Sequence, residues 1–434
     1  MGFLDILLRS FGDMFQTFSD ISRVAGEVWF LVLPPMLFFI FKLLWMWHVQ
    51  NDYIESIQNV LLEIIPPRDV EKSPKVMETV FDGLSGTDKT PSTVEQYIQG
   101  YLPPLFSLEI AGGDGVAHMY IRTPVSFRNL IEAYLYAQYP GIEIMEVSND
   151  YVDAIPKGAP NKEWDLWGAD FEFARPDPYP IKTYHAFEED VTGKMIDPLA
   201  GIFETIGKLP PGQQVWLQYI VAPQGQTPYN TGRELLQELI GRVSKVKPVS
   251  ALGRAWTDVG DIVRNIPNAV NGTLEFSSAA EEKAENGDFS EFRLTPVEKK
   301  VIEALESNIG KNVFATKMRM VYIGKKKGFS RAVISSVVGG IKQFNDSNLN
   351  AFKPNDVTKT YANYVFSEPR LRYRQRRILR RYKFRDPDPD FTMMMLSTAE
   401  LATVFHIPDM AVVAPSLSRI TAKRSVAPSN LPIQ

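Results

Sequence analysis

Phe106-Ser-Leu-Glu-Ile-Ala-Gly-Gly-Asp-Gly-Val-Ala-His-Met-Tyr-Ile-Arg122 is the stretch with the clearest fold signal in the chain. Two runs rich in β-branched, aromatic and other apolar residues flank a short segment that contains three glycines. Such runs around a glycine-rich turn are typical of a β-hairpin. We therefore expect antiparallel strands over residues 106–110 and 116–122.

The segments on either side of this hairpin complete a recognisable order of elements. A helix that opens with a proline in its first turn precedes the hairpin, and an apolar helix capped by Ser126 follows it. The order strand, helix, strand, strand, helix, strand is that of a ferredoxin-like unit. We assign it to residues 48–150. The outer elements are a strand at Val60–Ile65, a helix at Ser73–Gly83, a helix from Ser126 to Tyr139 and a strand at Ile142–Val147.

A second, degenerate copy of this order is predicted over residues 151–368. An insertion at residues 225–293 interrupts it. The polar run Ser277–Asp288 inside the insertion predicts a mobile loop on the surface. The expected strands are Ala169–Arg175, Ile181–Tyr184, Gln214–Ala222 and Phe314–Ile323, and the expected helices are Pro198–Leu209, Pro296–Asn308 and Arg331–Phe344.

Val28–Trp47 is an apolar run of about 20 residues, the length that crosses the hydrocarbon core of a membrane as a helix. Lys42 is its single charge, and tryptophans lie at both borders. Pro34 and Pro35 weaken the helix and leave a re-entrant segment as the alternative. We predict an α+β chain: an N-terminal transmembrane helix at 28–47, followed by tandem ferredoxin-like (βαββαβ) domains with an insertion in the second.

Residues 1–27, before the span, place apolar side chains at helical spacing. They predict an amphipathic leader on the bilayer surface or against partner helices, with a flexible leader as the alternative. Residues 391–434, at the other end, predict a short helix, beginning near Ser397, and an extended proline-rich tail.

Composition excludes several kinds of chemistry. The 434 residues include no cysteine, which rules out disulfides, thiol catalysis and thiolate metal sites. The four histidines are scattered without ligand-like spacing. No Gly-Lys pair sits in a phosphate-binding loop followed by Ser or Thr, so the chain lacks the mark of a nucleotide motor. We expect a protein that is not an enzyme and has no cofactor or metal.

A strongly basic segment lies within residues 369–390, which we interpret as a connector. It could bind nucleic-acid phosphates or anionic lipid headgroups. An internal helix that pairs with the acids of the chain, whose net charge is −4, is the third possibility. The candidate binding residues are Arg370, Arg372, Arg374, Arg376, Arg377, Arg380, Arg381, Lys383 and Arg385.

Three parts of the chain resemble one family. They are Asp197–Pro223, Met320–Phe352 and Leu396–Pro408, the last followed by Ala414-Pro415 and Pro428–Pro432. Together they resemble the membrane-anchored N-terminal region of type IV secretion and conjugation ATPases from Gram-positive and small-genome bacteria. The similarity spans most of residues 50–432. That region normally precedes a RecA-like motor with a Walker motif, so either the motor is a separate polypeptide or this sequence is a fragment.

The resemblance also bears on topology. Arg9 and Arg23 precede the span and residues 48–67 contain no Lys or Arg, which favours a cytoplasmic N-terminus. The resemblance implies the opposite, a cytoplasmic main body on a single-pass anchor in the cell membrane, and we adopt it. The expected function is a non-catalytic scaffold that docks a separate motor ATPase of a type IV secretion or DNA-transfer machine. The alternative is a membrane-tethered nucleic-acid-binding protein. Membrane lipids, DNA and further copies of the chain are the other expected partners.

Overall fold

A computed structural model describes residues 30, 33–67, 72–155, 158–187, 196–224, 227–239, 295–363, 366–387 and 393–408. The chain forms two compact units. Unit 1 contains Met1–Asn59 and Lys89–Pro104, and unit 2 contains Val60–Asp88 and Leu105–Gln434.

Unit 1 consists of a helix over residues 33–56 and the short helix α3 (Thr93–Tyr97). The indole N–H of Trp45 donates to the carbonyl of Tyr97 at 2.8 Å, and the ammonium of Lys42 lies 5.5 Å from the centre of the Tyr97 ring. These two contacts tie α3 to the long helix.

The long helix of unit 1 contains much of the stretch in which the sequence predicts a membrane span. Large apolar side chains such as Phe38, Phe39 and Leu43 are exposed on it. Among the helices of the described residues, none combines the length and the apolar character that a membrane crossing requires. The predicted leader, 1–27, lies outside the described residues, as do 28, 29, 31 and 32.

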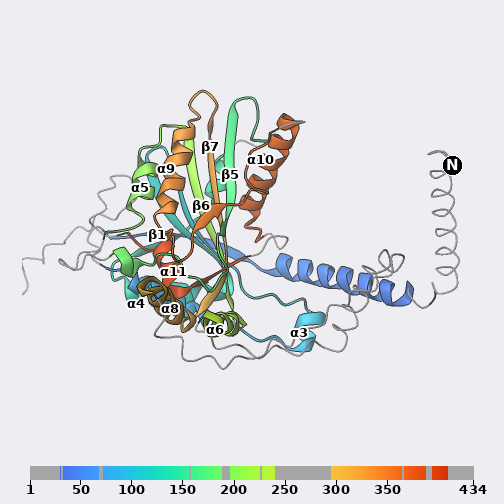
Figure 1. The fold of residues 1–434 in the computed structure, drawn as a ribbon. Helices are drawn as coiled ribbons and strands as arrows, with labels where there is room; N and C mark the ends of the chain where they lie inside the picture. The colour runs from blue at the N-terminus through green and yellow to red at the C-terminus, as the bar shows by residue number, and fades with distance from the viewer. Residues whose placement is uncertain are drawn as a thin grey trace, which may run out of the picture. The chain divides into compact units, whose positions relative to one another are not determined.

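Unit 2 is built on one large antiparallel sheet, which gives the chain a mixed α+β fold (Figure 1). Its strands lie in the order β4 (Glu143–Glu146), β1 (Asn59–Ile65), β3 (Val116–Pro124), β2 (Phe106–Gly113), β6 (Gln213–Gln224), β7 (Val313–Lys325), β5 (Trp164–Phe173) and β8 (Phe352–Pro354), and β9 (Met394–Ser397) also pairs with β7. The predicted hairpin is β2–β3, with Leu108 opposite Ile121. Because β2 also pairs with β6, the two predicted domains share one sheet.

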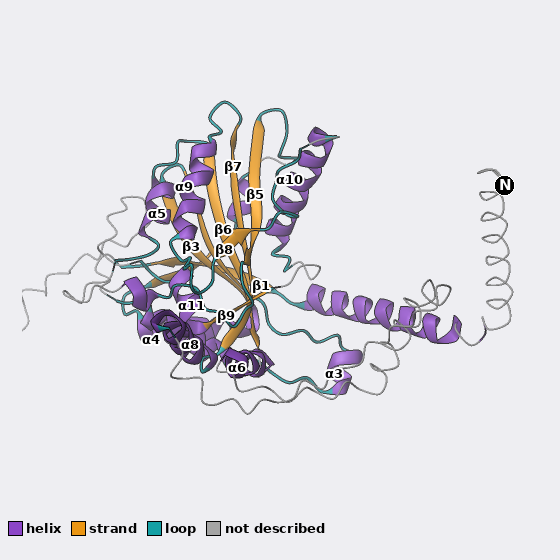
Figure 2. Ribbon diagram, viewed as in Figure 1, coloured by secondary structure: helices purple, strands orange, loops and turns teal. Residues whose placement is uncertain are grey.

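Helices cover both faces of the sheet (Figure 2). One face, which we call the apolar face, packs against α2 (Lys75–Ser85), α4 (Arg128–Gln138), α5 (Ala200–Gly207), α9 (Arg331–Lys342) and α11 (Thr398–Val404). The other face, the α10 face, packs against α10 (Ser367–Phe384), which contacts β5 and β7. Two further helices, α6 (Thr227–Leu239) and α8 (Pro296–Ile309), contact each other.

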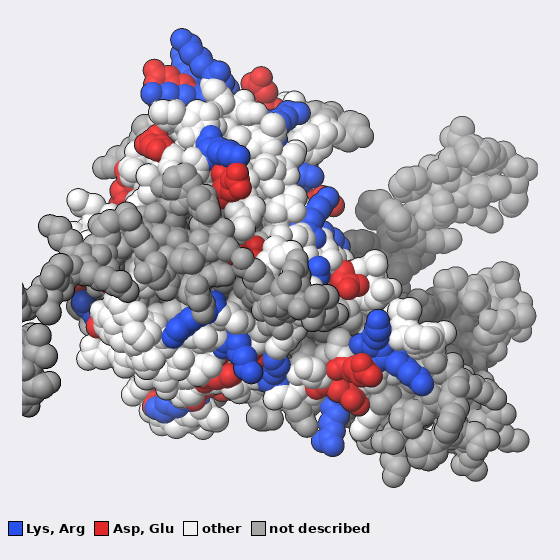
Figure 3. All heavy atoms as spheres, turned by 90° about the vertical axis from the view of Figure 1, so that its left-hand side faces the viewer, with Lys and Arg blue, Asp and Glu red and all other residues white. Residues whose placement is uncertain are grey.

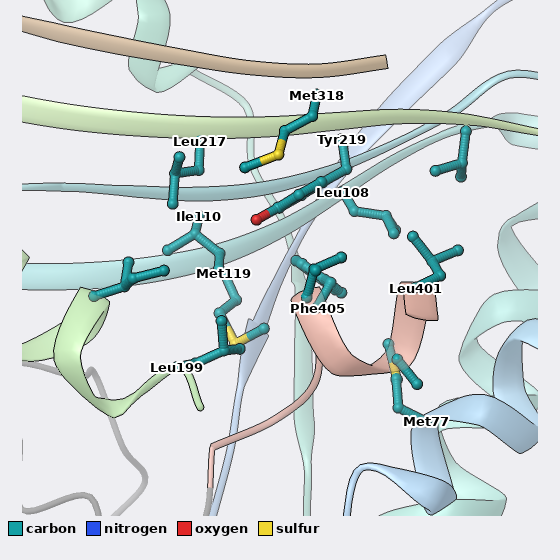
Figure 4. Close-up of a cluster of buried hydrophobic side chains, with 14 of the residues drawn as sticks. Met77, Leu108, Ile110, Met119, Leu199, Leu217, Tyr219, Met318, Leu401 and Phe405 are labelled. Atoms are coloured by element: carbon teal, nitrogen blue, oxygen red, sulfur yellow. The ribbon is translucent and has the colours of Figure 1, made fainter. Parts of the chain in front are cut away.

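The core follows from the two-residue period of the strands. On β6, Leu217 and Tyr219 belong to the cluster on the apolar face, whereas Trp216 belongs to the cluster under α10. Figure 4 shows how side chains from the strands meet those of the covering elements, among them Leu401 and Phe405 near the C-terminus. Residues 401–407 therefore contribute to the core.

Ile181–Tyr184, predicted as a strand, does not form one. Residues 181–183 have no regular structure, and Tyr184 opens the 3-10 turn η3 (Tyr184–Phe187). The backbone N–H of Ile181 donates to Glu400 Oε1 and that of Tyr184 to Thr403 Oγ1, both at 2.9 Å. Side chains of α11 thus accept the hydrogen bonds that a neighbouring strand would accept.

Two further expectations need correction. Ser126 does not cap the helix after the hairpin, because it lies inside the 3-10 turn η1 (Val125–Phe127) and α4 starts from Phe127 without a side-chain cap. The basic segment is not a connector: its residues up to 384 belong to α10, which packs on the sheet. The predicted insertion is described only as α6, and the rest of it and the proline-rich tail after residue 408 lie outside the described residues.

Candidate polyanion-binding site

A row of polar side chains crosses four neighbouring strands on the α10 face. The register places Glu109 opposite Gln218, Gln218 opposite Arg319, and Arg319 opposite Asp170. We call these four residues the polar row. Gln218 Nε2 donates to Glu109 Oε1 at 3.0 Å, and Arg319 Nη1 donates to Gln218 Oε1 at 3.2 Å. Arg319 Nε donates to Asp170 Oδ1 at 2.7 Å, which closes the chain of contacts.

Burial makes these contacts obligatory. Each residue of the polar row is at most 1% exposed, and a buried charge without a partner is strongly unfavourable. Lys317 Nζ lies 3.8 Å from Asp170 Oδ2, and Ser107 Oγ donates to Glu109 Oε1 at 2.6 Å. Both ends of the row are acidic. Asp170 at one end is paired with Lys317, and Glu109 at the other end is paired with Arg385.

Arg385 joins the end of α10 to the polar row. It occupies the C-cap of the helix in a left-handed conformation, with φ of +53°. Its Nε and Nη2 donate to the two carboxylate oxygens of Glu109 at 3.0 and 3.1 Å, and Nη2 also donates to Asp150 at 3.0 Å. Burial lowers the pKa of Arg385, but the two carboxylates outweigh burial and raise it on balance.

Two tyrosines complete the contact between α10 and the row. Tyr151 donates its hydroxyl to Glu109 Oε2 at 2.7 Å and lies 2.8 Å, oxygen to oxygen, from Tyr382 of α10. Burial raises the pKa of both hydroxyls well above the ordinary value. Both side chains therefore remain neutral hydrogen-bond donors at physiological pH.

The buried stripe of α10 consists of Gln375, Ile378, Leu379 and Tyr382. Gln375 Nε2 donates to the carbonyl of Leu166 at 2.6 Å, so a polar side chain also holds the helix on β5. Because these residues face the sheet, the arginines of α10 lie on the other sides of the helix.

A second stripe of α10 lines a cavity of about 440 Å³. Arg370, Arg374, Arg377 and Arg381, at spacings of four, three and four, share one side of the helix. We call them the inner stripe. Across the cavity lie Asp170 and the loop residues Val357 and Thr358.

The third stripe points away from the sheet. Arg372, Arg376 and Arg380 recur every four residues and are exposed. We call them the outer stripe. Two exposed aromatic rings lie beside it, Tyr373 at 65% and Phe384 at 72% exposure. The outer stripe therefore presents guanidinium groups and rings together on one exposed surface.

The nine basic residues predicted as a binding segment thus divide into several groups. The inner and outer stripes account for seven of them. Lys383 is half-buried, 3.7 Å from Asp153, and Arg385 is buried against Glu109 and Asp150. Arg385 is therefore a structural residue, because its guanidinium is enclosed by carboxylates of its own chain.

The polar row was missed from the sequence. Its signal is a polar residue with an apolar residue on each side, within each of four β-prone runs, as in Leu108-Glu-Ile110, Leu217-Gln-Tyr219 and Met318-Arg-Met320. Such a residue on a strand that is covered on both faces must find a buried partner. The pairing partner of each strand decides which residue that is.

Other polar groups of unit 2 have structural partners. His406 Nε2 lies 3.2 Å from Asp197 Oδ1, and His118 Nδ1 lies 2.6 Å from Glu63 Oε1. In the described part of the chain, no group of three or more histidine or acidic side chains is arranged to hold a metal ion. On the side of unit 2 that carries α5 and α9, basic and acidic residues are interspersed (Figure 3).

Comparison with known proteins gives a family but no activity. No curated protein matches the chain. The model of a family described as a domain of unknown function, DUF8128, matches residues 55–419. This match covers both faces of the sheet, the polar row and α10. Because it extends over most of the sequence, the chain belongs to the DUF8128 family.

Proposed function

We propose that the chain binds nucleic acid through the outer stripe of α10. The observation that carries this proposal is the exposure of Arg372, Arg376 and Arg380 beside two exposed aromatic rings. Guanidinium groups neutralise backbone phosphates, and aromatic rings stack on unpaired bases. This pairing of chemistries favours single-stranded nucleic acid over a lipid headgroup, which offers no base to stack.

The anchoring of α10 also supports the proposal. Arg385, Gln375 and Tyr382 hold the helix on the sheet, so the outer stripe is presented on a fixed support. The backbone that carries these arginines is therefore ordered before phosphates bind, so that only the side chains lose conformational entropy on binding. The arginines on this surface are also concentrated, although the net charge of the chain is −4.

The test is the salt dependence of binding. Fluorescence anisotropy of a labelled single-stranded oligonucleotide with the full chain should give an affinity that falls with rising salt. The triple variant R372A/R376A/R380A should lower the slope of log affinity against log salt by about 2, since each lost contact contributes about 0.7. The matched control is K325A/K326A/K327A, which removes three exposed lysines, the last residue of β7 and the two that follow it.

Three results would count against nucleic-acid binding. They are no salt-sensitive affinity in the wild-type chain, an equal loss of slope in the lysine control, and binding of anionic vesicles with no binding of the oligonucleotide. The last result would assign α10 to a membrane surface instead.

A second candidate function rests on the resemblance of Asp197–Pro223, Met320–Phe352 and Leu396–Pro408 to conjugation ATPases. We propose that the chain is a non-catalytic scaffold on a single-pass membrane anchor, with a cytoplasmic main body, in a type IV secretion or DNA-transfer machine. In this role it docks a separate motor ATPase. DNA binding by α10 is compatible with such a machine.

The finer fold proposed with this function is a pair of ferredoxin-like halves. In the first half β3 lies between β1 and β2, and in the second half β7 lies between β5 and β6. This interleaving is what a split β-α-β unit requires, and it supports the proposal. The halves meet where β2 pairs with β6.

Docking of a motor is tested by cross-linking in the native membrane followed by purification in detergent. We expect a motor ATPase to co-purify with the tagged chain, and the R372A/R376A/R380A variant to retain it. If repeated preparations recover cross-linked DNA and no ATPase, the scaffold proposal fails and DNA binding stands alone.

A further inference from the structure

The first part of the long helix of unit 1 exposes apolar side chains on several sides. Every residue from 33 to 45 is exposed. The rings of Phe38, Phe39 and Phe41 are 64%, 64% and 61% exposed. Because successive residues of a helix are about 100° apart, these three rings point in different directions. A single partner helix would cover one stripe of this surface, whereas lipid covers all of its sides. The pattern therefore favours lipid around this part of the helix.

The following part of the same helix is covered by a segment that the chain inserts between two parts of unit 2. Residues 89–104, which we call the clasp, belong to unit 1, although the chain belongs to unit 2 before and after them. Gly100 of the clasp has φ of +67°, and a Cβ atom built there would lie 2.2 Å from the carbonyl oxygen of Val49. The ring centres of Tyr53 and Tyr101 are 5.6 Å apart. The clasp therefore packs closely against the helix.

Groups typical of a membrane interface lie together where the clasp meets the exposed part of the helix. The indole N–H of Trp45 donates to the carbonyl of Tyr97, and the ammonium of Lys42 lies 5.5 Å from the centre of the Tyr97 ring. Tryptophan and tyrosine concentrate at the level of the lipid headgroups. A lysine near the end of an apolar helix directs its ammonium to the same level. These three residues indicate where the headgroups would lie along the helix.

The clasp also presents a small apolar surface of its own. Val94 of α3 and Ile98 at its C-cap are 54% and 63% exposed, and Tyr97 is 38% exposed. Their spacings of three and four residues place them on one side of the short helix. Glu95 is paired with Lys89 at 2.5 Å, so the charges beside this surface compensate each other. The apolar side of the clasp is thus neutral and lies close to the residues that indicate the headgroup level.

We propose that the clasp binds the surface of a phospholipid bilayer, with Val94, Tyr97 and Ile98 between the headgroups and the acyl chains. Amphipathic elements at a membrane surface bury their apolar side about 5–10 Å deep in this region. The inference rests on the membrane anchor of the proposed scaffold and adds a second point of lipid contact to it. It does not depend on the arginines of α10, because a neutral surface requires no anionic lipid.

The chain contains no cysteine, which allows a test with single labels on the full chain. Val94→Cys and Ile98→Cys carry an environment-sensitive fluorophore on the proposed lipid side of α3. Gln96→Cys is the matched control, because Gln96 is exposed about 200° around the helix from Val94. Phe38→Cys reports on the anchor. All four positions are exposed, so the substitutions should leave the fold intact. Each labelled chain is reconstituted in phosphatidylcholine vesicles with a nitroxide lipid, its nitroxide either at headgroup level or near the bilayer centre.

The nitroxide at headgroup level should quench the labels at 94 and 98 at least about twofold more than the label at 96, because only one side of a surface element enters the lipid. Lipid nitroxides should also quench the label at 38. Equal quenching at 94, 96 and 98 overturns the proposal. So does protection of 94 and 98 from aqueous iodide without quenching by lipid, because a protein then covers this side.

The label at 38 separates this inference from the proposed anchor. Quenching by lipid at 38, with none at 94 and 98, rejects the role of the clasp and leaves the anchor standing. If lipid quenches none of the labels, the anchor and the inference that rests on it both fail. Phosphatidylcholine has no net charge, so attraction of the basic helix α10 to anionic lipid does not contribute to any of these results.

Discussion

The two faces of the sheet in unit 2 use the same strands in different ways. On the apolar face, side chains such as Leu217 and Met318 pack against several helices. On the α10 face, their strand neighbours Gln218 and Arg319 form a hydrogen-bonded row beneath a single basic helix. Apolar packing is non-directional, whereas each contact of the row requires a particular partner at a particular distance.

This difference teaches how the register of the sheet is specified. A shift by one residue moves every side chain of a strand to the other face. On β7 such a shift would place Arg319 among the apolar side chains of the other face and leave Asp170 without its ion pair. The polar row thus penalises wrong registers, and the apolar face supplies most of the favourable burial.

The largest effect is expected for Arg319→Ala. This change leaves Asp170 Oδ1 and Gln218 Oε1 buried without their donor, and loss of one partner of a buried ion pair costs about 3–5 kcal/mol. Denaturant unfolding measures the loss. The triple replacement K317M/R319M/D170L removes all three charges of this buried group and should cost less than the single change. A single-variant cost below about 1 kcal/mol would contradict the role assigned to the row, since exposed pairs contribute that little.

A comparable or smaller loss is expected for Leu217→Ala on the apolar face. Truncation of a fully buried leucine costs about 2–5 kcal/mol, because transfer and cavity terms add. The matched control Leu217→Met keeps the volume and should cost less than about 1.5 kcal/mol. If Leu217→Met were as destabilising as Arg319→Ala, the proposed contrast between adaptable and directional packing would be wrong.

The smallest effect concerns the buried acid on the apolar face. Burial raises the pKa of Glu400 above its ordinary value of 4.5, despite hydrogen bonds from Ser397 and Ile181. Because the folded chain holds this proton more tightly than the unfolded chain, its contribution to stability is complete below pH 4.5 and is lost as the pH rises through the raised pKa. Unfolding free energies of wild type and Glu400→Gln across this range measure it. The variant should have the flatter profile, and parallel profiles would contradict the shift.

Local patterns were sufficient to predict most of the strands and helices. The hairpin was predictable because the glycines between residues 111 and 115 and the β-prone runs beside them lie close in sequence. The irregular structure of Ile181–Tyr184 was not predictable. The side chains that accept hydrogen bonds from its backbone belong to α11, 219 residues further along the chain. The three-residue strand β8 is too short to carry a periodic pattern of its own.

The candidate site was predictable only in part. The many arginines were enough to predict a binding segment. If the segment is assumed to be a helix, the spacing of Arg372, Arg376 and Arg380 also predicts that they share one side of it. The role of Arg385 was not visible, because the carboxylate that binds it, Glu109, lies 276 residues earlier. Charge patterns show which residues are basic, but burial decides which of them remain available to a partner.

The seam between β2 and β6 has a consequence for synthesis of the chain. Residue 113 ends β2 and residue 213 begins β6, so about 100 residues separate the two strands. At a translation rate of about 5–20 residues per second, β2 emerges as an open edge for roughly 5–20 seconds before its neighbour exists. An open edge is a template for pairing with other chains. During synthesis the chain is therefore expected to pass through a state in which the open edge of β2 must be kept from pairing with other copies, for example by a chaperone.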